Sequence, residues 1–124
     1  MIVGIGTDIV KISRIRESLD RLGERFAERI LAASELERFR ATTRPERYLA
    51  KRFSAKEAAA KALGCGIGEG ANWSDIVVEN NSAGAPRLRF DGNAARTAAA
   101  LGVTAIHVSI SDEHDYAVAF VVLS

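Results

Sequence analysis

The sequence predicts an α+β fold, in which a small antiparallel sheet packs against two or three helices. Three observations support this: a short apolar run opens the chain, helical periodicity fills residues 13–63, and two strand-like runs close it. With 124 residues and 48% hydrophobic side chains, the chain is expected to form one domain over residues 1–124.

The composition excludes several classes of protein. A net charge of +1 gives no basic field of the kind that binds nucleic acid. The single cysteine forms no internal disulfide, which fits a reducing compartment. The N-terminal residues lack the pattern of a signal peptide or a membrane span. We therefore expect a cytoplasmic protein with neither nucleic acid nor membrane as partner.

The first expected element is a buried strand at residues 2–6 (IVGIG), whose glycines allow close neighbours. Asp8 follows inside the same apolar pattern, because Ile9 and Val10 resume it. A carboxylate in such a run is costly to bury unless it is paired or holds a metal. The alternative is that Asp8 is a turn or capping residue.

A first helix is expected to start with Ser13 as its cap and to be broken or kinked at Gly23. Its apolar stripe consists of Ile15, Leu19 and Leu22. The opposite face carries four cations: Lys11, Arg14, Arg21 and Arg25. Acidic residues are interleaved with them, so this face is either an ordinary solvated surface or a docking surface.

Two more helices are expected before residue 65. Residues 34–37 (SELE) have the form of a capping box that opens the second helix. Pro45 suits the first turn of the third, which should reach Leu63 and end at Gly64.

Glu57 and Lys61 lie four residues apart and share one face of this third helix, which alanines keep slim. A glycine-rich loop, residues 65–70 (CGIGEG), follows the helix. A carboxylate and an ammonium group before such a loop would suit a metal-bound phosphate. The alternative is an ordinary solvent-facing ion pair.

The second half of the chain completes the sheet. Three elements are expected first, namely strands at 75–79 and 87–90 and a helix at 93–101. Residues 106–110 alternate between apolar and polar, as in a strand with one covered face. Residues 116–123 are nearly all apolar, which predicts a strand buried on both faces. In so small a domain, another subunit would help to cover it.

Three segments, in this order and spacing, resemble one family: GIGTDI at 4–9, RFSAKEAAAKALG at 52–64, and HVSISD at 107–112 followed by YAVAF. The family is holo-[acyl-carrier-protein] synthase, the short type of 4′-phosphopantetheinyl transferase. The resemblance implies the 4′-phosphopantetheinyl transferase fold and a homotrimer with active sites between subunits. It also implies Mg²⁺-dependent transfer of phosphopantetheine from coenzyme A to a serine of apo acyl carrier protein. The other product would be adenosine 3′,5′-bisphosphate, and the pathway served would be fatty acid biosynthesis.

The resemblance assigns roles to individual residues. Asp8 and Glu57 match the family's metal-binding acids, and Lys61 matches the lysine that faces the phosphates. These three are the expected catalytic residues, with Lys61 offsetting charge on the departing bisphosphate. Arg52 matches a position at the phosphates of the coenzyme. Further coenzyme contacts are expected at Gly64, Gly66 and Ile67. Pro86 and His107 of a neighbouring subunit are expected to line the nucleotide site.

The carrier protein would supply both the nucleophile and a charged partner surface. Because the attacking serine belongs to the carrier, no nucleophile is expected in this chain. Acyl carrier proteins are acidic, so the cationic face of the first helix gains an expected partner. Arg14 matches a docking arginine of the family, and Arg21 and Arg25 would extend the patch.

Two positions depart from the family pattern. Ala85 stands where a lysine is common, and Asp112 stands where a histidine is common. The general base stays open between Glu57, a metal-bound water and Asp112. Two rival functions use the same residues: a Mg²⁺-dependent pyrophosphohydrolase, and a non-catalytic trimeric binding module in which Glu57 and Lys61 form a structural ion pair.

Overall fold

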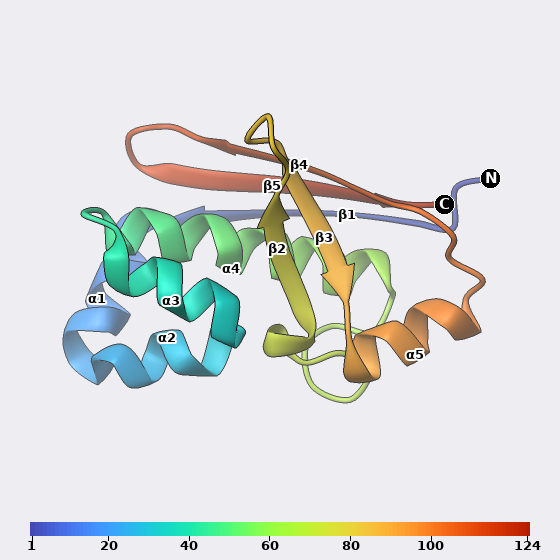
Figure 1. Cartoon of the computed structure of the whole chain (residues 1–124), viewed down its shortest axis with the longest axis horizontal. Coiled ribbons are helices and arrows are strands. Elements are labelled where there is room, and N and C mark those ends of the chain that lie inside the picture. Colours follow the sequence, from blue (N-terminus) through green and yellow to red (C-terminus); the bar gives the residue numbers. More distant parts are fainter.

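The computed structural model describes residues 1–124 and confirms an α+β fold built around one long helix (Figure 1). A three-stranded antiparallel sheet has the order β1 (Gly4–Lys11), β5 (Tyr116–Leu123) and β4 (Ile106–Asp112). A separate antiparallel pair is formed by β2 (Ile76–Asn80) and β3 (Pro86–Phe90). The helices are α1 (Ile12–Leu22), α2 (Glu24–Ile30), α3 (Ala33–Ala41), α4 (Pro45–Ala62) and α5 (Gly92–Ala100), with a 3₁₀ turn at Trp73–Asp75.

Helix α4 lies along the inner face of the three-stranded sheet, and the other elements cover its remaining sides (Figure 1). One hydrophobic cluster joins the second half of α4 to β5, β2 and α5. The other joins the first half of α4 to α1 and α2. No helix has both the length and the apolar character needed to cross a membrane.

Strand β1 and helix α4 pack backbone against backbone. A Cβ atom added to Gly4 would lie 2.0 Å from the carbonyl oxygen of Ala62, and one added to Gly6 would lie 2.0 Å from that of Ala58. Only residues without a side chain allow this approach. Asp8 is on the same side of the strand as the two glycines, because side chains alternate along a strand. The close contact therefore carries Asp8 over α4.

The sheet has one covered face and one open face within a single chain. On β5 the covered side chains are Ala117, Ala119, Val121 and Leu123, all buried. On the open face Phe120 is 46% exposed, and Ile5 and Ile9 of β1 are 58% and 63% exposed. The prediction that residues 116–123 are buried on both faces is therefore wrong for one chain, because nothing in it covers the second face.

The two predicted helix caps are also wrong. Helix α1 starts at Ile12, directly after β1, so Ser13 lies inside its first turn and caps nothing. Helix α3 starts at Ala33, so Ser34 lies inside it as well. The first turn of α3 is instead closed by Glu35, whose Oε1 accepts a hydrogen bond of 2.9 Å from the Ala32 amide. The predicted end of α4 is confirmed, with Gly64 in the left-handed region at φ 77°.

We expect Gly6→Ala to lower the free energy of unfolding by about 3 kcal/mol, because the new Cβ must displace the backbone of α4. Gly102→Ala is the control for a different cost: the φ of Gly102 is left-handed, unlike that of Gly6, and nothing lies within 4 Å of its added Cβ. That variant should lose only about 1 kcal/mol, the cost of the backbone conformation. Urea denaturation measures both. An equal or smaller loss for Gly6→Ala would contradict the close packing of β1 on α4.

Candidate active site

Asp8 and Glu57 line one cavity between β1, α1, α4 and the 3₁₀ turn. Arg14, Phe53 and Trp73 also contribute to its wall. The structure thus brings together the two carboxylates that the sequence singled out, although they belong to a strand and a helix far apart in the chain. The contact of Gly6 with α4 produces this placement, because it fixes the part of β1 that carries Asp8.

Lys61 extends from α4 to the strand. Its Nζ donates to Asp8 Oδ1 at 3.1 Å and to the Thr7 carbonyl oxygen at 3.0 Å. Lys61 therefore pairs with Asp8, and the predicted alternative of a Glu57–Lys61 ion pair is wrong. The Lys61 side chain is 52% exposed, so its ammonium group is open to a ligand.

Glu57 has a different partner. Its Oε1 accepts a hydrogen bond of 3.2 Å from the indole Nε1 of Trp73. The second oxygens, Asp8 Oδ2 and Glu57 Oε2, take part in none of the hydrogen bonds or ion pairs that the chain makes. Each carboxylate therefore keeps one oxygen for a ligand at the cavity.

The two carboxylates suit a magnesium ion that shares its coordination with a substrate. Mg²⁺ is usually held by one or two carboxylates and completes its shell with phosphate and water oxygens. Nowhere do three or more His, Cys, Asp or Glu side chains group closely enough to form a metal site from protein alone. Asp8 and Glu57 thus fit the ion that the resemblance implies, with the remaining ligands left to the substrate.

A second cavity, which we call the basic cavity, lies between α3, the first half of α4 and the β2–β3 turn. It is lined by five cations: Arg38, Arg44, Arg47, Lys51 and Arg52. One acid, Asp112, reaches into it and pairs with Arg47 at 2.8 Å and with Lys51 at 3.8 Å. Only Arg52 of these cations was predicted as a site residue. The positive excess suits a phosphate group.

Arg52 is the buried member of the basic cavity, 6% exposed. Its guanidinium lies over the ring of Tyr48, 4.2 Å from the ring centroid, and its Nη2 donates to Asn80 Oδ1 at 3.3 Å. The Nε nitrogen is buried and has no hydrogen-bond partner. Nε lies 3.9 Å from Glu35 Oε2, so the charge of Arg52 is paired with that buried carboxylate.

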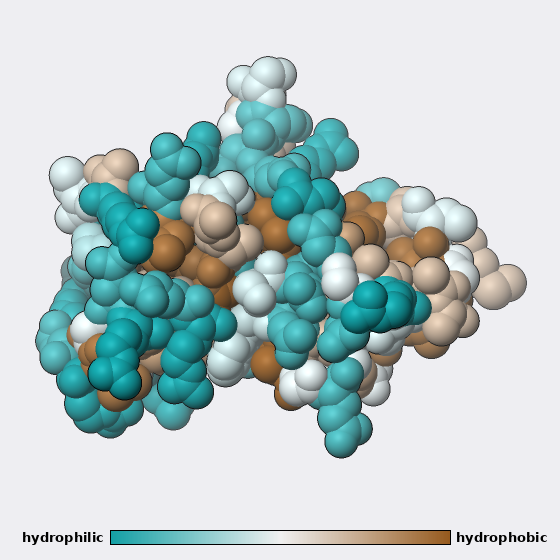
Figure 2. All heavy atoms as spheres, turned by 60° about the horizontal axis from the view of Figure 1, so that its bottom comes forward, coloured by the Kyte–Doolittle hydropathy of each residue, from teal (hydrophilic) through white to brown (hydrophobic).

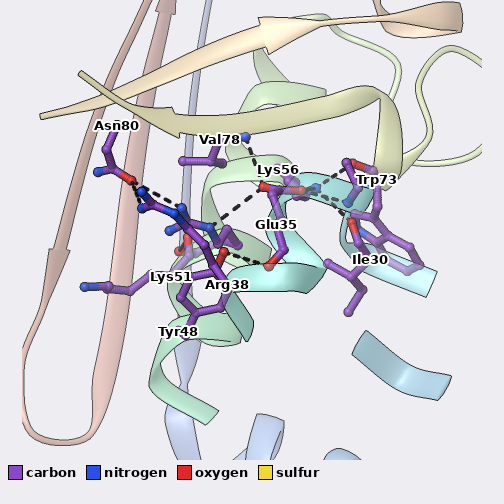
Figure 3. Close-up of polar contacts among 12 residues, drawn as sticks. Ile30, Glu35, Arg38, Tyr48, Lys51, Lys56, Trp73, Val78 and Asn80 are labelled. Carbon is purple, nitrogen blue, oxygen red and sulfur yellow. Dashed lines mark hydrogen bonds and ion pairs between the residues drawn. The ribbon is translucent and has the colours of Figure 1, made fainter. Parts of the chain in front are cut away.

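Behind the two cavities lies a buried ion pair between Glu35 and Lys56 (Figure 3). Lys56 is fully buried, and its Nζ donates to Glu35 Oε1 at 2.6 Å, to the Ile30 carbonyl at 2.8 Å and to the Trp73 carbonyl at 2.9 Å. Burial lowers the pKa of Lys56, and the charge of Glu35 opposes that shift. Glu35 Oε2 also accepts from the Val78 amide at 3.0 Å.

Sequence reasoning missed this ion pair. A lysine on a long helix is usually solvated, so the sequence alone gives Lys56 no role. The sequence does contain one signal, which is that Lys56 shares a helix face with alanines 55, 59 and 60. All three alanines are fully buried in the structure. A lysine on such a face must find a partner inside the protein.

The remaining predicted site residues are distributed over other surfaces. Gly64, Gly66 and Ile67 lie in the loop after α4, and the two glycines have φ values of 77° and 67°, which favour glycine. Pro86 and His107 line a third cavity together with Ala85. Within one chain, neither of these residues lines the cavity of Asp8 and Glu57.

The three predicted docking arginines are all exposed on α1 and α2. Arg14 differs from the other two because it lines the cavity of Asp8 and Glu57. Arg21 and Arg25 form no ion pair. Hydrophilic side chains dominate the end of the molecule that carries α1, α2 and α3 (Figure 2).

Residues 4–121 match the family model of the 4′-phosphopantetheinyl transferase superfamily. A holo-[acyl-carrier-protein] synthase of Shewanella denitrificans is 55% identical over 122 residues, covering 98% of this chain and 97% of the relative. The crystal structure of the synthase from Neisseria meningitidis is 40% identical with a TM-score of 0.94, covering 100% of this chain and 99% of that one.

The synthase from Helicobacter pylori, solved in complex with coenzyme A, is 32% identical with a TM-score of 0.85, covering 97% of this chain and 99% of that one. The chain therefore belongs to the 4′-phosphopantetheinyl transferase superfamily, within its holo-[acyl-carrier-protein] synthases, and is an enzyme of that transferase class. The fold class and the family resemblance drawn from the sequence are confirmed.

Proposed function

We propose that this single domain, residues 1–124, transfers 4′-phosphopantetheine from coenzyme A to a serine of apo acyl carrier protein. The products are holo acyl carrier protein and adenosine 3′,5′-bisphosphate, the cofactor is Mg²⁺, and the reaction serves fatty acid biosynthesis in the cytoplasm. One observation carries the proposal: Asp8 and Glu57 line one cavity, and Lys61 binds Asp8 beside it. The coenzyme A bound by the Helicobacter pylori relative supports the choice of donor.

The reaction breaks a phosphorus–oxygen bond of a pyrophosphate as a hydroxyl attacks in line, so it requires positioning and charge neutralisation above all. Asp8 and Glu57 would hold the cation, which when bound supplies positive charge to the pyrophosphate oxygens. Lys61 adds a second positive charge that offsets the negative charge of the departing bisphosphate. The basic cavity, with Arg52, would bind another phosphate of the coenzyme.

The proton of the attacking serine also needs an acceptor. Of the two carboxylates considered as base, only Glu57 lines the cavity that holds Asp8. Asp112 lies in the basic cavity and is engaged by Arg47 and Lys51. Within one chain this arrangement favours Glu57 over Asp112 as the residue that accepts the proton.

A homotrimer with active sites between subunits is part of the proposal. It would cover the exposed apolar residues of the open sheet face, including Phe120, Ile5 and Ile9. It would also allow Pro86 and His107 of one subunit to contribute to the nucleotide site of another. An isolated chain explains neither the exposed apolar face of the sheet nor the distance of Pro86 and His107 from the cavity of Asp8 and Glu57.

We expect the wild-type chain to sediment at three times the mass of one chain. Phe120→Arg should shift the protein to the monomer, because a cation would have to be buried in the interface. Analytical ultracentrifugation measures both, with Arg96→Glu on α5 as a control for an altered surface charge. A wild-type monomer at micromolar concentration would refute the trimer.

The transfer itself is tested by mass spectrometry of apo acyl carrier protein incubated with Mg²⁺ and coenzyme A. We expect the carrier to gain about 340 Da, the mass of the transferred group. Glu57→Gln should slow this gain by about 100-fold or more, since it removes a charge that acts in the transition state. Glu37→Gln, on the exposed surface of α3, should not slow it.

Two other outcomes would support the rival functions. Cleavage of coenzyme A without any carrier protein would support a pyrophosphohydrolase. A carrier that gains no mass with the wild-type protein would support a binding module.

Arg14→Glu should raise the KM for acyl carrier protein by about tenfold, since a reversed charge at the rim of a docking surface repels an acidic partner. The KM for coenzyme A should rise less than the KM for acyl carrier protein, although Arg14 also lines the cavity of Asp8 and Glu57. Arg96→Glu carries the same charge change on α5, away from α1, and should leave both constants unchanged. Equal effects of Arg14→Glu on the two substrates would argue against docking through this arginine.

A further inference from the structure

Trp73, the only tryptophan of the chain, donates its indole N–H to one of the two proposed metal ligands. The bond joins Nε1 to Glu57 Oε1 over 3.2 Å, and both side chains are partly buried in the wall of the same cavity. It is the only hydrogen bond that the Glu57 carboxylate makes within the chain. The orientation of that carboxylate therefore depends on Trp73.

Trp73 is itself held from two sides. Its carbonyl oxygen accepts from the fully buried Lys56 at 2.9 Å, and Lys56 is fixed by Glu35 (Figure 3). Its ring packs against Phe53, with the ring centroids 6.0 Å apart. Lys56 and Glu57 are neighbours on α4, so one residue anchors the backbone of Trp73 and the next receives its indole N–H.

This arrangement fits a device that preorganises a metal ligand. A glutamate has several rotatable bonds, and a free side chain must lose that freedom when it binds a cation. A hydrogen bond to one carboxylate oxygen removes part of the freedom beforehand and leaves the other oxygen available. A phenyl ring at position 73 would keep an aromatic side chain, though a smaller one, and would lack the N–H group.

We propose that Trp73 is a positioning residue, whose indole N–H holds the Glu57 carboxylate with Oε2 available to the divalent cation. The proposal depends on the proposed function, in which Asp8 and Glu57 hold that cation. It assigns to the buried Glu35–Lys56 pair a role at the site, because the pair anchors the residue that orients a ligand.

The test is the Mn²⁺ dissociation constant of the folded protein with coenzyme A bound, measured from the electron paramagnetic resonance signal of free Mn²⁺. Trp73→Phe removes the N–H and keeps both an aromatic ring and the carbonyl that Lys56 binds. We expect it to weaken Mn²⁺ binding by about tenfold, which is the low end of the roughly 10- to 100-fold loss seen when a residue that orients a metal ligand is replaced. In steady-state assays, the Mg²⁺ concentration for half-maximal rate should rise by a similar factor, whereas the KM for acyl carrier protein should stay within twofold.

Ser54→Ala is the matched control, because it removes another side-chain hydrogen bond from α4, the one that Ser54 donates to the Lys51 carbonyl. It should leave Mn²⁺ binding unchanged. A loss of thermal stability in Trp73→Phe without any change in Mn²⁺ affinity would show a purely structural role and would overturn the proposal.

Should Trp73→Phe fail to fold, replacing the single tryptophan by 3-benzothienylalanine keeps the shape and substitutes sulfur for the N–H. The expected loss of affinity is the same, and wild-type affinity would overturn the proposal. Glu57→Gln separates this question from the function itself. If the wild type binds Mn²⁺ no better than Glu57→Gln, the proposed function fails, and this inference fails with it.

Discussion

The contact between the backbones of β1 and α4 determines where the charged side chains of the site lie. It exists because β1 presents Gly4 and Gly6 to a helix whose facing residues, Ala58 and Ala62, are also small. The strand therefore lies closer to the helix axis than side chains would allow. Asp8 follows two residues later on the same side, within reach of Lys61. Small residues thus decide where the charged ones meet.

Two of the three lysines of helix α4, Lys56 and Lys61, have opposite functions. Lys56 is fully buried, and protein oxygens accept all three of its hydrogen bonds, so it belongs to the framework. Removing its partner would leave a buried charge uncompensated, which is strongly destabilising. Lys61 is half exposed, and an ion pair of that kind contributes little to stability. Its contact with Asp8 can therefore rearrange around a phosphate at little cost to the fold.

Much of this could be predicted from the sequence, because the deciding signals were local. The order of strands and helices followed from apolar periodicity, and Gly64 marked the end of α4. Asp8 is conspicuous because a carboxylate is costly inside an apolar run, and Glu57 because it shares a helix face with Lys61 just before a glycine-rich loop.

The missed features depend on contacts between distant segments. The residues near Lys56 in the sequence do not indicate that Glu35 and the Trp73 carbonyl are its partners. Each of the four other cations of the basic cavity, taken alone, resembles an ordinary solvated residue. The second face of β5, which stays open within one chain, is a related case. An apolar run shows that two faces avoid water, but it does not say whether the cover belongs to the same chain.

In the proposed reaction, Asp8 and Glu57 share one divalent cation at the pyrophosphate of coenzyme A. The most direct measurement is an anomalous difference map from crystals grown with Mn²⁺ and coenzyme A. We expect one strong peak within roughly 2.2 Å of an oxygen of each carboxylate, close to the distances that Mg²⁺ adopts. A fully occupied peak that touches neither carboxylate, or a bound coenzyme whose phosphates lie away from both, would contradict it.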